Sequence, residues 1–114
     1  MTRLPVATSW FSSEDVGEGV TRVTEPHLCD LVSANLWWIH GQRHDVLVDT
    51  GLGVASLRQH LPEVLEHDTL GVISHTHLDH AGGAHELGGV AVHALEADAV
   101  LRPSRASLHT STEL

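Results

Sequence analysis

The sequence predicts an α/β fold, and three patterns support this class. Short stretches that are apolar, or that alternate between apolar and polar residues, recur along the chain as strands do. Segments with apolar residues at helical spacing separate several of these stretches. A segment rich in histidine and aspartate directly follows one of the predicted strands, and α/β folds commonly place their chemistry at such strand ends.

Two predicted strand regions occupy the first half of the chain. Residues 1–18 are polar and are expected to be irregular, whereas residues 19–24 alternate apolar and polar side chains, as a half-buried strand does. Residues 35–49 contain two β-prone stretches separated by a Gly-Gln-Arg segment at 41–43. This pattern predicts a β-hairpin whose turn lies at that segment.

Helices and strands are expected to alternate in the second half. Residues 54–65 have apolar side chains at helical spacing, and Pro62 predicts a break in that helix. Residues 69–74 form a short apolar stretch, which is typical of a buried strand. The elements expected after it are a helical turn at 84–87, a strand at 90–93 and a helix at 94–101.

Composition narrows the class of protein. The 114 residues suffice for one small domain, and the hydrophobic content of 41% fits a globular chain. No apolar run is long enough to span a membrane, the first residues lack a signal-peptide core, and Cys29 has no second cysteine to pair with. The formal net charge is −9, and the six basic residues, all arginine, form no cluster. We therefore expect a cytoplasmic protein that binds neither nucleic acid nor membrane.

Four potential metal ligands occupy six consecutive positions after the strand at 69–74. They are His75, His77, Asp79 and His80. Gly82 and Gly83 follow, and they permit the sharp turn that would bring the four side chains together. Imidazole nitrogen and carboxylate oxygen both coordinate Zn²⁺, at roughly 2.0–2.2 Å. The chain has 11 histidines, so chance crowding on the surface is the alternative, but residue types, spacing and the preceding strand together favour a metal site.

The residues alone leave the number of metal ions open. His75 and His77 would share one ion, whereas Asp79 and His80 would bind a second ion or orient a water molecule on the first. Zinc can lower the pKa of a bound water molecule to about 7. The cluster therefore predicts a hydroxide nucleophile at neutral pH.

The chain resembles the metallo-β-lactamase-fold hydrolases. The motif His-x-His-x-Asp-His at residues 75–80, followed by the glycine pair, is similar to the signature of that family. The resemblance extends to residues 35–39 and 46–51 and covers residues 19–101 in the family's order. It implies an αββα sandwich with metal ions at one edge.

The same resemblance implies roles for five residues. His75 and His77 would bind the first metal ion, and Asp79 and His80 the second. Asp49 is similar to a buried aspartate of the family that lies beneath the metal loop, and it would support the ligands without binding the metal itself.

The family also implies ligands that this sequence does not clearly supply. Its members contribute a further histidine, a bridging aspartate and a last histidine well downstream of the motif. His93 ends a predicted strand, and His109 lacks the setting of the family's last histidine, so neither is expected to be a ligand. We therefore expect residues 1–114 to be the N-terminal half of such a domain, with a core at 19–101 and a truncated tail at 102–114.

The function implied is that of a zinc-dependent hydrolase with one or two zinc ions. A metal-bound hydroxide would attack a carbonyl carbon, and Asp79 would be the catalytic residue that orients it. A narrower resemblance, to the acyl-coenzyme A thioesterases of the family, rests on residues 49–57 and 90–97 and favours a thioester or ester substrate. The chain alone is expected to lack the complete site and to be inactive.

Two alternatives stay open at this point. Some relatives with a similar signature use one iron ion to oxidise persulfides, and the downstream ligands that would separate the two groups are not recognised in the sequence. The chain could also be a non-catalytic, truncated module that binds metal. Half of a sandwich would leave an apolar sheet face uncovered, and copies of the chain could associate through that face.

Overall fold

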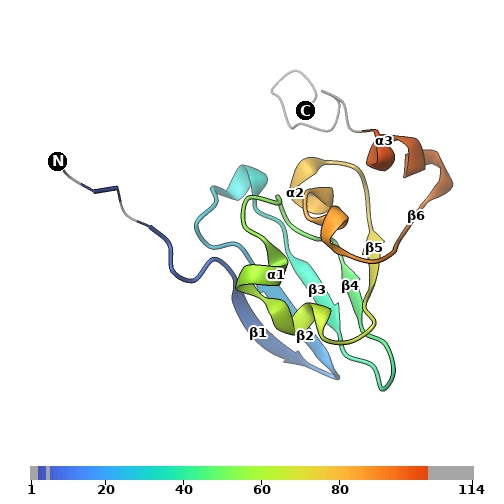
Figure 1. Ribbon diagram of the computed structural model, residues 1–114, viewed down its shortest axis with the longest axis horizontal. Helices are drawn as coiled ribbons and strands as arrows, with labels where there is room; N and C mark the ends of the chain where they lie inside the picture. The colour runs from blue at the N-terminus through green and yellow to red at the C-terminus, as the bar shows by residue number, and fades with distance from the viewer. Residues whose placement is uncertain (1–2, 5, 103–114) are drawn as a thin grey trace.

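The chain forms a six-stranded sheet in which the strands lie side by side in the order of the sequence (Figure 1). The structure is a computed structural model, and it describes residues 3–4 and 6–102. The first four strands pair antiparallel, and the last three pair in parallel. The strands are β1 (Ser12–Gly17), β2 (Val20–Thr24), β3 (Leu36–Ile39), β4 (Val46–Val48), β5 (Leu70–Ile73) and β6 (Val90–Val92). The described chain therefore changes from a meander to a parallel arrangement at β4.

Short helices connect these strands. The α-helices are α1 (Leu57–His60), α2 (Leu78–Ala81) and α3 (Ala97–Leu101), and the 3₁₀ helices are η1 (Asp30–Val32), η2 (Pro62–Leu65), η3 (Ala84–Glu86) and η4 (Ala94–Glu96). The crossover that parallel strands require carries α1 and η2 between β4 and β5. Pro62 starts η2, which confirms the predicted break in the helix.

The core lies on one face of the sheet. Side chains alternate between the two faces of a strand, and the inward positions of β2, β3 and β4 are Val23, Leu36 and Leu47, all fully buried. Leu57 of α1 and Val64 of η2 cover them. Figure 1 shows α1 lying against the sheet on this side.

The opposite face of the sheet is apolar and partly uncovered. Trp37 and Ile39 of β3 are 36% and 39% exposed, and Leu70 of β5 is 44% exposed. These side chains belong to neighbouring strands, since Ile39 pairs with Val46 and Val46 with Leu70. The described residues contain one sheet of the sandwich that the resemblance implied, and self-association through this face stays a prediction.

The expectation of an irregular N-terminal segment is wrong for residues 12–17, which form β1. A tight turn joins β1 to β2, and its residues Gly17, Glu18 and Gly19 have φ angles of 93°, 56° and 76°. All six residues of β1 are exposed, so the strand lacks the apolar alternation that reveals a half-buried strand.

Two further expectations need adjustment. The histidine segment was expected to be a loop, but it contains the helical turn α2. The helix expected at 94–101 is divided into η4 and α3. The predicted strands at 19–24, 69–74 and 90–93, and the hairpin at 35–49, are confirmed to within one residue at each end.

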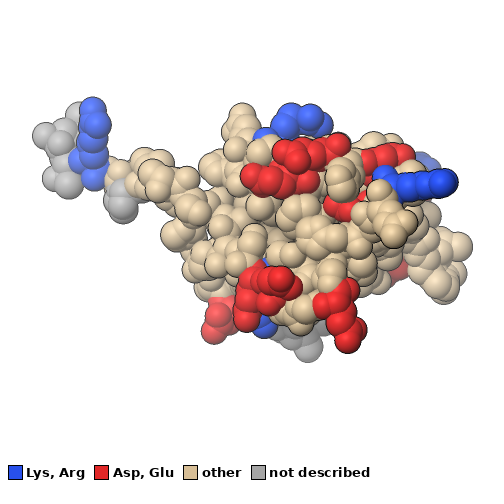
Figure 2. Space-filling view, turned by 90° about the horizontal axis from the view of Figure 1, so that it is seen from below, with Lys and Arg blue, Asp and Glu red and all other residues tan. Residues whose placement is uncertain are grey.

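The charged surface agrees with the composition. On the face seen in Figure 2, the basic side chains lie apart from one another and form no continuous basic surface, whereas acidic side chains occur in several places. Within residues 3–4 and 6–102, no helix combines the length and the apolar character needed to cross a membrane.

Candidate metal centre

The histidine motif lies at the carboxyl end of β5. The strand ends at Ile73, and Ser74 to His77 lead directly into α2, which carries Asp79 and His80. Because β5 pairs in parallel with both β4 and β6, the motif lies in the middle of the parallel part of the sheet. This is the edge at which α/β proteins commonly bind ligands.

The structure brings all four predicted ligands together. The imidazole ring of His75 lies 4.0 Å from that of His80 and 5.0 Å from that of His77, centroid to centroid. Asp79 is buried, and its Oδ2 lies 3.4 Å from Nε2 of His80. The sequence prediction that these side chains converge is therefore met by the geometry, while their role as metal ligands stays a prediction.

Asp49 lies behind the motif as the resemblance implied. Its Oδ1 accepts a hydrogen bond from the backbone N–H of Ser74 at 2.8 Å, and its Oδ2 accepts bonds from the Ser74 hydroxyl at 2.8 Å and from Nδ1 of His80 at 2.7 Å. Asp49 has a φ of 64°, a left-handed conformation that aspartate tolerates better than most residues. This backbone turn directs the carboxylate toward the end of β5.

These bonds determine which ring nitrogens remain as acceptors. A carboxylate only accepts, so Nδ1 of His80 donates to Asp49 and leaves Nε2 with the lone pair. The hydroxyl of Ser74 also donates to Asp49, so its oxygen accepts from Nδ1 of His75 at 2.9 Å. One carboxylate thus orients two imidazoles, and each would present Nε2 to a metal ion.

The pKa of His75 lies below its ordinary value. Burial of the ring disfavours its charged form, and the neighbouring rings of His80 and His77 lower the pKa further. A neutral imidazole is the form that binds metal ions, so the lowered pKa of His75 is compatible with the predicted role.

Thr50 fixes α2 against the end of β4. Its backbone N–H and its hydroxyl both donate to the carbonyl oxygen of His80, at 2.8 and 3.0 Å, and the hydroxyl accepts from the N–H of Gly83 at 2.9 Å. The carbonyl of Gly51 accepts from the N–H of Gly82 at 3.0 Å. The loop after β4 therefore holds the C-terminal end of the short helix.

The glycine pair is needed for a different reason from the one expected. Gly82 and Gly83 have φ angles of −62° and −96°, which any residue can adopt, so they are not required for the turn itself. A Cβ on Gly82 would overlap the carbonyl oxygen of Leu52, and one on Gly83 would lie 2.7 Å from that of Thr50. The glycines allow two backbone segments to touch.

The donor chemistry fits a zinc ion, but the arrangement joins donors in pairs. Three imidazoles and one carboxylate are typical zinc ligands. Across residues 3–4 and 6–102, no group of three or more His, Cys, Asp or Glu side chains is arranged to hold a metal ion. His93 does not join the motif, since its Nδ1 accepts from the N–H of Leu95 at the start of η4. His109 lies outside the described residues.

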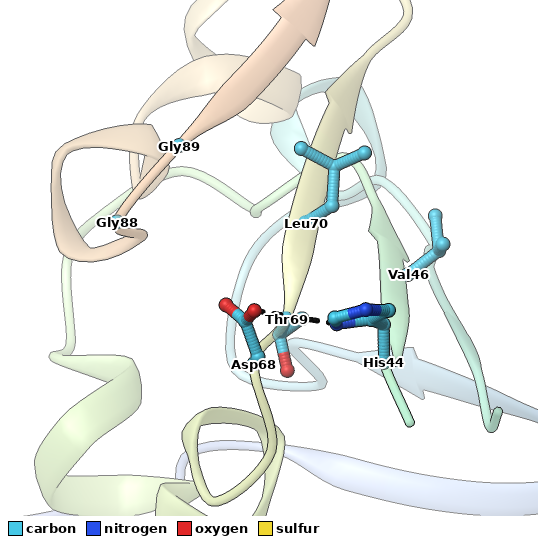
Figure 3. Close-up of a pocket in the computed structure, with 7 residues that line it drawn as sticks. All are labelled: His44, Val46, Asp68, Thr69, Leu70, Gly88 and Gly89. Atoms are coloured by element: carbon cyan, nitrogen blue, oxygen red, sulfur yellow. Dashed lines mark ion pairs between the residues drawn. The ribbon is translucent and has the colours of Figure 1, made fainter. Parts of the chain in front are cut away.

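A hollow of about 560 Å³ lies at the other end of β5. Figure 3 shows His44 facing Asp68 across it, with Val46 and Leu70 beside them. Nδ1 of His44 lies 3.3 Å from Oδ2 of Asp68, and both side chains are exposed. Asp68 comes before the strand that the motif follows, so this hollow does not belong to the candidate metal centre.

Three supporting residues were not anticipated from the sequence. They are Ser74, Thr50 and Glu25, which hold the motif or the loop beneath it. Ser74 lies at a predictable position, the last residue of a strand that runs into the motif. Thr50 and Glu25 act on segments about 30 residues away, and no local pattern indicates that.

Solved structures with a similar arrangement of strands show which fold this chain has. A metallo-β-lactamase from Erythrobacter litoralis matches 88% of this chain and half of its own, with a TM-score of 0.60 and 21% identity. The metallo-β-lactamase FIM-1 from Pseudomonas aeruginosa, solved in a mono-zinc form, matches 81% of this chain and 46% of its own, also with a TM-score of 0.60, at 19% identity. The chain therefore has the fold of part of a metallo-β-lactamase, as the motif predicted.

Another relative is more similar to this chain in sequence than these two solved structures are. The human acyl-coenzyme A thioesterase MBLAC2 is 32% identical over 108 residues, which cover 84% of this chain and 39% of the human protein. The chain thus spans about two fifths of the length of this relative. No family model matches the chain. These relatives relate it to the metallo-hydrolases.

Proposed function

We propose that residues 1–114 form the N-terminal part of a zinc-dependent hydrolase that acts on thioester or ester carbonyls. The observation that carries this proposal is the convergence of His75, His77, Asp79 and His80 at the end of β5. Asp49 accepts hydrogen bonds from Ser74 and His80, so the orientation of the donors is fixed before a metal ion binds.

Each residue has a distinct part in this proposal. His75 and His77 would hold one zinc ion, and Asp79 with His80 a second. When bound, zinc supplies a water molecule with a lowered pKa and a positive charge against the carbonyl oxygen. The Asp79 carboxylate would orient the water, take its proton as the oxygen adds to the carbonyl carbon, and return that proton to the departing thiol or alcohol.

Two observations favour a thioester or ester over a β-lactam. The relative more similar in sequence is named as an acyl-coenzyme A thioesterase, whereas the β-lactamases match in fold at lower identity. An apolar hollow of about 370 Å³ lies beside α2, lined by Leu78 and Ala81 of that helix and by Val90, Val100 and Leu101. This hollow suits the hydrocarbon part of an acyl group.

The described donors do not make a complete catalytic site. A catalytic zinc ion usually has three protein ligands and one open position. Since the motif joins its donors in pairs, we expect turnover to require a ligand beyond those described. We expect the chain of 114 residues to bind zinc without appreciable hydrolysis.

A chimera tests the function directly. Residues 19–101 would replace the matching segment of human MBLAC2, and hydrolysis of acyl-coenzyme A, S-acyl glutathione, a lactone and a cephalosporin would be compared. We expect the thioesters to be cleaved fastest. Asp79→Ala should lower kcat by ~10²-fold or more, because a general base typically contributes that much, and it should also weaken the zinc ion that Asp79 would share with His80. A folded, zinc-loaded chimera that prefers the cephalosporin, or that is indifferent to Asp79→Ala, would contradict the proposal.

A further inference from the structure

Glu25 is a buried carboxylate directly after β2. It is 1% exposed, and a charge so far from water requires hydrogen-bond donors. The indole Nε1 of Trp10 donates to Oε2 at 2.8 Å, and the backbone N–H of Leu52 donates to Oε1 at 2.9 Å. Glu25 thus joins the segment before β1 to the loop after β4, which lies 27 residues away in sequence.

The loop is shaped to receive this carboxylate. Gly51 has a φ of 78°, and a Cβ at this position would overlap Oε1 of Glu25. A side chain on Gly51 would therefore push the carboxylate out of reach of the Leu52 N–H. The close approach fixes residues 51–52 on Glu25.

The same loop holds the helix that carries Asp79 and His80. Gly51 accepts from the N–H of Gly82, and Thr50 donates twice to the carbonyl of His80. A displacement of the loop would therefore move α2 and the imidazole at its centre. The path from Trp10 through Glu25 to α2 consists of hydrogen bonds of 2.8 to 3.0 Å.

We propose that Glu25 is a positioning residue for the metal centre: by holding the loop at residues 50–52, it sets where α2 presents its donors. The inference rests on the proposed function for its zinc readout. Glu25 accepts from the N–H of Leu52, and the adjacent residues Thr50 and Gly51 bond to α2, so its effect reaches the helix through this loop.

The chain supplies a matched control. Asp45 is also a buried carboxylate, and it too accepts from a tryptophan, Trp38 at 3.0 Å, and from a backbone N–H, that of Gly41 at 3.0 Å. Asp45 precedes β4 and lies at the edge away from the motif. The two carboxylates thus share their chemistry and differ in what they hold.

The first experiment measures Zn²⁺ affinity by calorimetry and the visible absorption of bound Co²⁺, on the chain of 114 residues. Glu25→Gln should weaken zinc binding about tenfold and shift the Co²⁺ bands, since supporting residues typically contribute 10–100-fold. Trp10→Phe, which keeps the carboxylate, should act in the same direction by less. Asp45→Asn should change neither readout. Equal zinc affinity and equal spectra in the Glu25 and Asp45 variants would overturn the proposal.

A second measurement is made without metal, so that failure of the zinc site is told apart from failure of the inference. Amide hydrogen exchange at Thr50 and Gly82 should accelerate in Glu25→Gln and not in Asp45→Asn. If Glu25→Gln does not fold, Trp10→Phe carries the comparison. Unchanged exchange at both amides would overturn the positioning role whether or not the chain binds zinc. A parent chain that binds no zinc would refute the proposed function and leave this second readout decisive.

Discussion

The two edges of the parallel sheet hold similar pairs of residues in different settings. At the motif edge, Asp49 accepts from Nδ1 of His80 at 2.7 Å. At the opposite edge, Asp45 lies 3.1 Å from Nδ1 of His67. The side chain of His80 is 23% exposed and that of His67 is 55% exposed, whereas both carboxylates are buried.

The two edges differ in what surrounds the histidine of each pair. Nε2 of His80 faces Oδ2 of Asp79 at 3.4 Å, and the imidazole of His75 lies tilted beside that of His80, so further potential donors surround this histidine. Asp45 instead accepts from Trp38 and Gly41 as well as from His67, so its bonds tie a turn to the sheet. A His–Asp pair is therefore weak evidence of a site, and the convergence of a further donor on the second nitrogen is the stronger sign.

The largest expected effect concerns zinc binding at the motif edge. His75→Ala combined with His77→Ala should reduce zinc affinity by at least about 100-fold, because two ligands are removed. The matched control is His44→Ala combined with His67→Ala at the opposite edge, which should leave the affinity unchanged. Elemental analysis and calorimetry measure both. Equal zinc content in the two double variants would erase the distinction between the edges.

Substitution of a glycine should cost more stability at the motif edge than at the opposite edge. Gly82→Ala should destabilise the fold by about 3 kcal/mol, because its Cβ would overlap the Leu52 carbonyl in a tightly packed place. Gly88→Ala, where a Cβ meets nothing within 4 Å, should be neutral or stabilising by up to about 1 kcal/mol. Urea unfolding gives both values, and a tolerated Gly82→Ala would show that the loop is not held as described.

Asp49→Asn tests the support of the donors. Asparagine keeps the size of the side chain and tolerates the left-handed φ, but its amide cannot accept at both atoms. We expect zinc affinity to fall about 10- to 100-fold. The ¹⁵N chemical shifts of the imidazoles should also show His75 and His80 losing their fixed tautomers. Retained tautomers and affinity would mean that Asp49 is structural, as Asp45 is.

At the opposite edge, the contribution of Asp45 to the stability of the fold should depend on pH. Burial raises the pKa of Asp45, but bonds from Gly41, His67 and Trp38 outweigh it and lower the pKa from 3.8 to about 2. A lowered folded-state pKa stabilises the fold above pH 4, and this contribution is lost as the pH falls toward 2. It amounts to roughly 2 kcal/mol.

Unfolding measured from pH 6 to pH 2 checks this. The stability difference between the parent chain and Asp45→Asn should be greatest near pH 5 and should shrink toward pH 2. A difference that stays constant over this range would contradict the lowered pKa.

Much of the parallel half could be predicted, because its strands are apolar and its ligands are consecutive. The motif at residues 75–80 needs only local sequence to be seen. β1 escaped prediction since it is exposed on both faces and has no apolar period. Glu25 and Thr50 escaped for another reason. Their partners, Leu52 and Gly83, lie 27 and 33 residues away, so only the folded chain shows what they hold.

The order of the strands bears on how the protein is made. Each strand pairs with the one before it in sequence, so the sheet can grow from one edge as the ribosome extends the chain. Among the six strands of the described residues, none has to enter between two that are already paired. Glu25, Asp49 and Thr50 precede the motif in sequence, so the residues that support the donors leave the ribosome before the donors do.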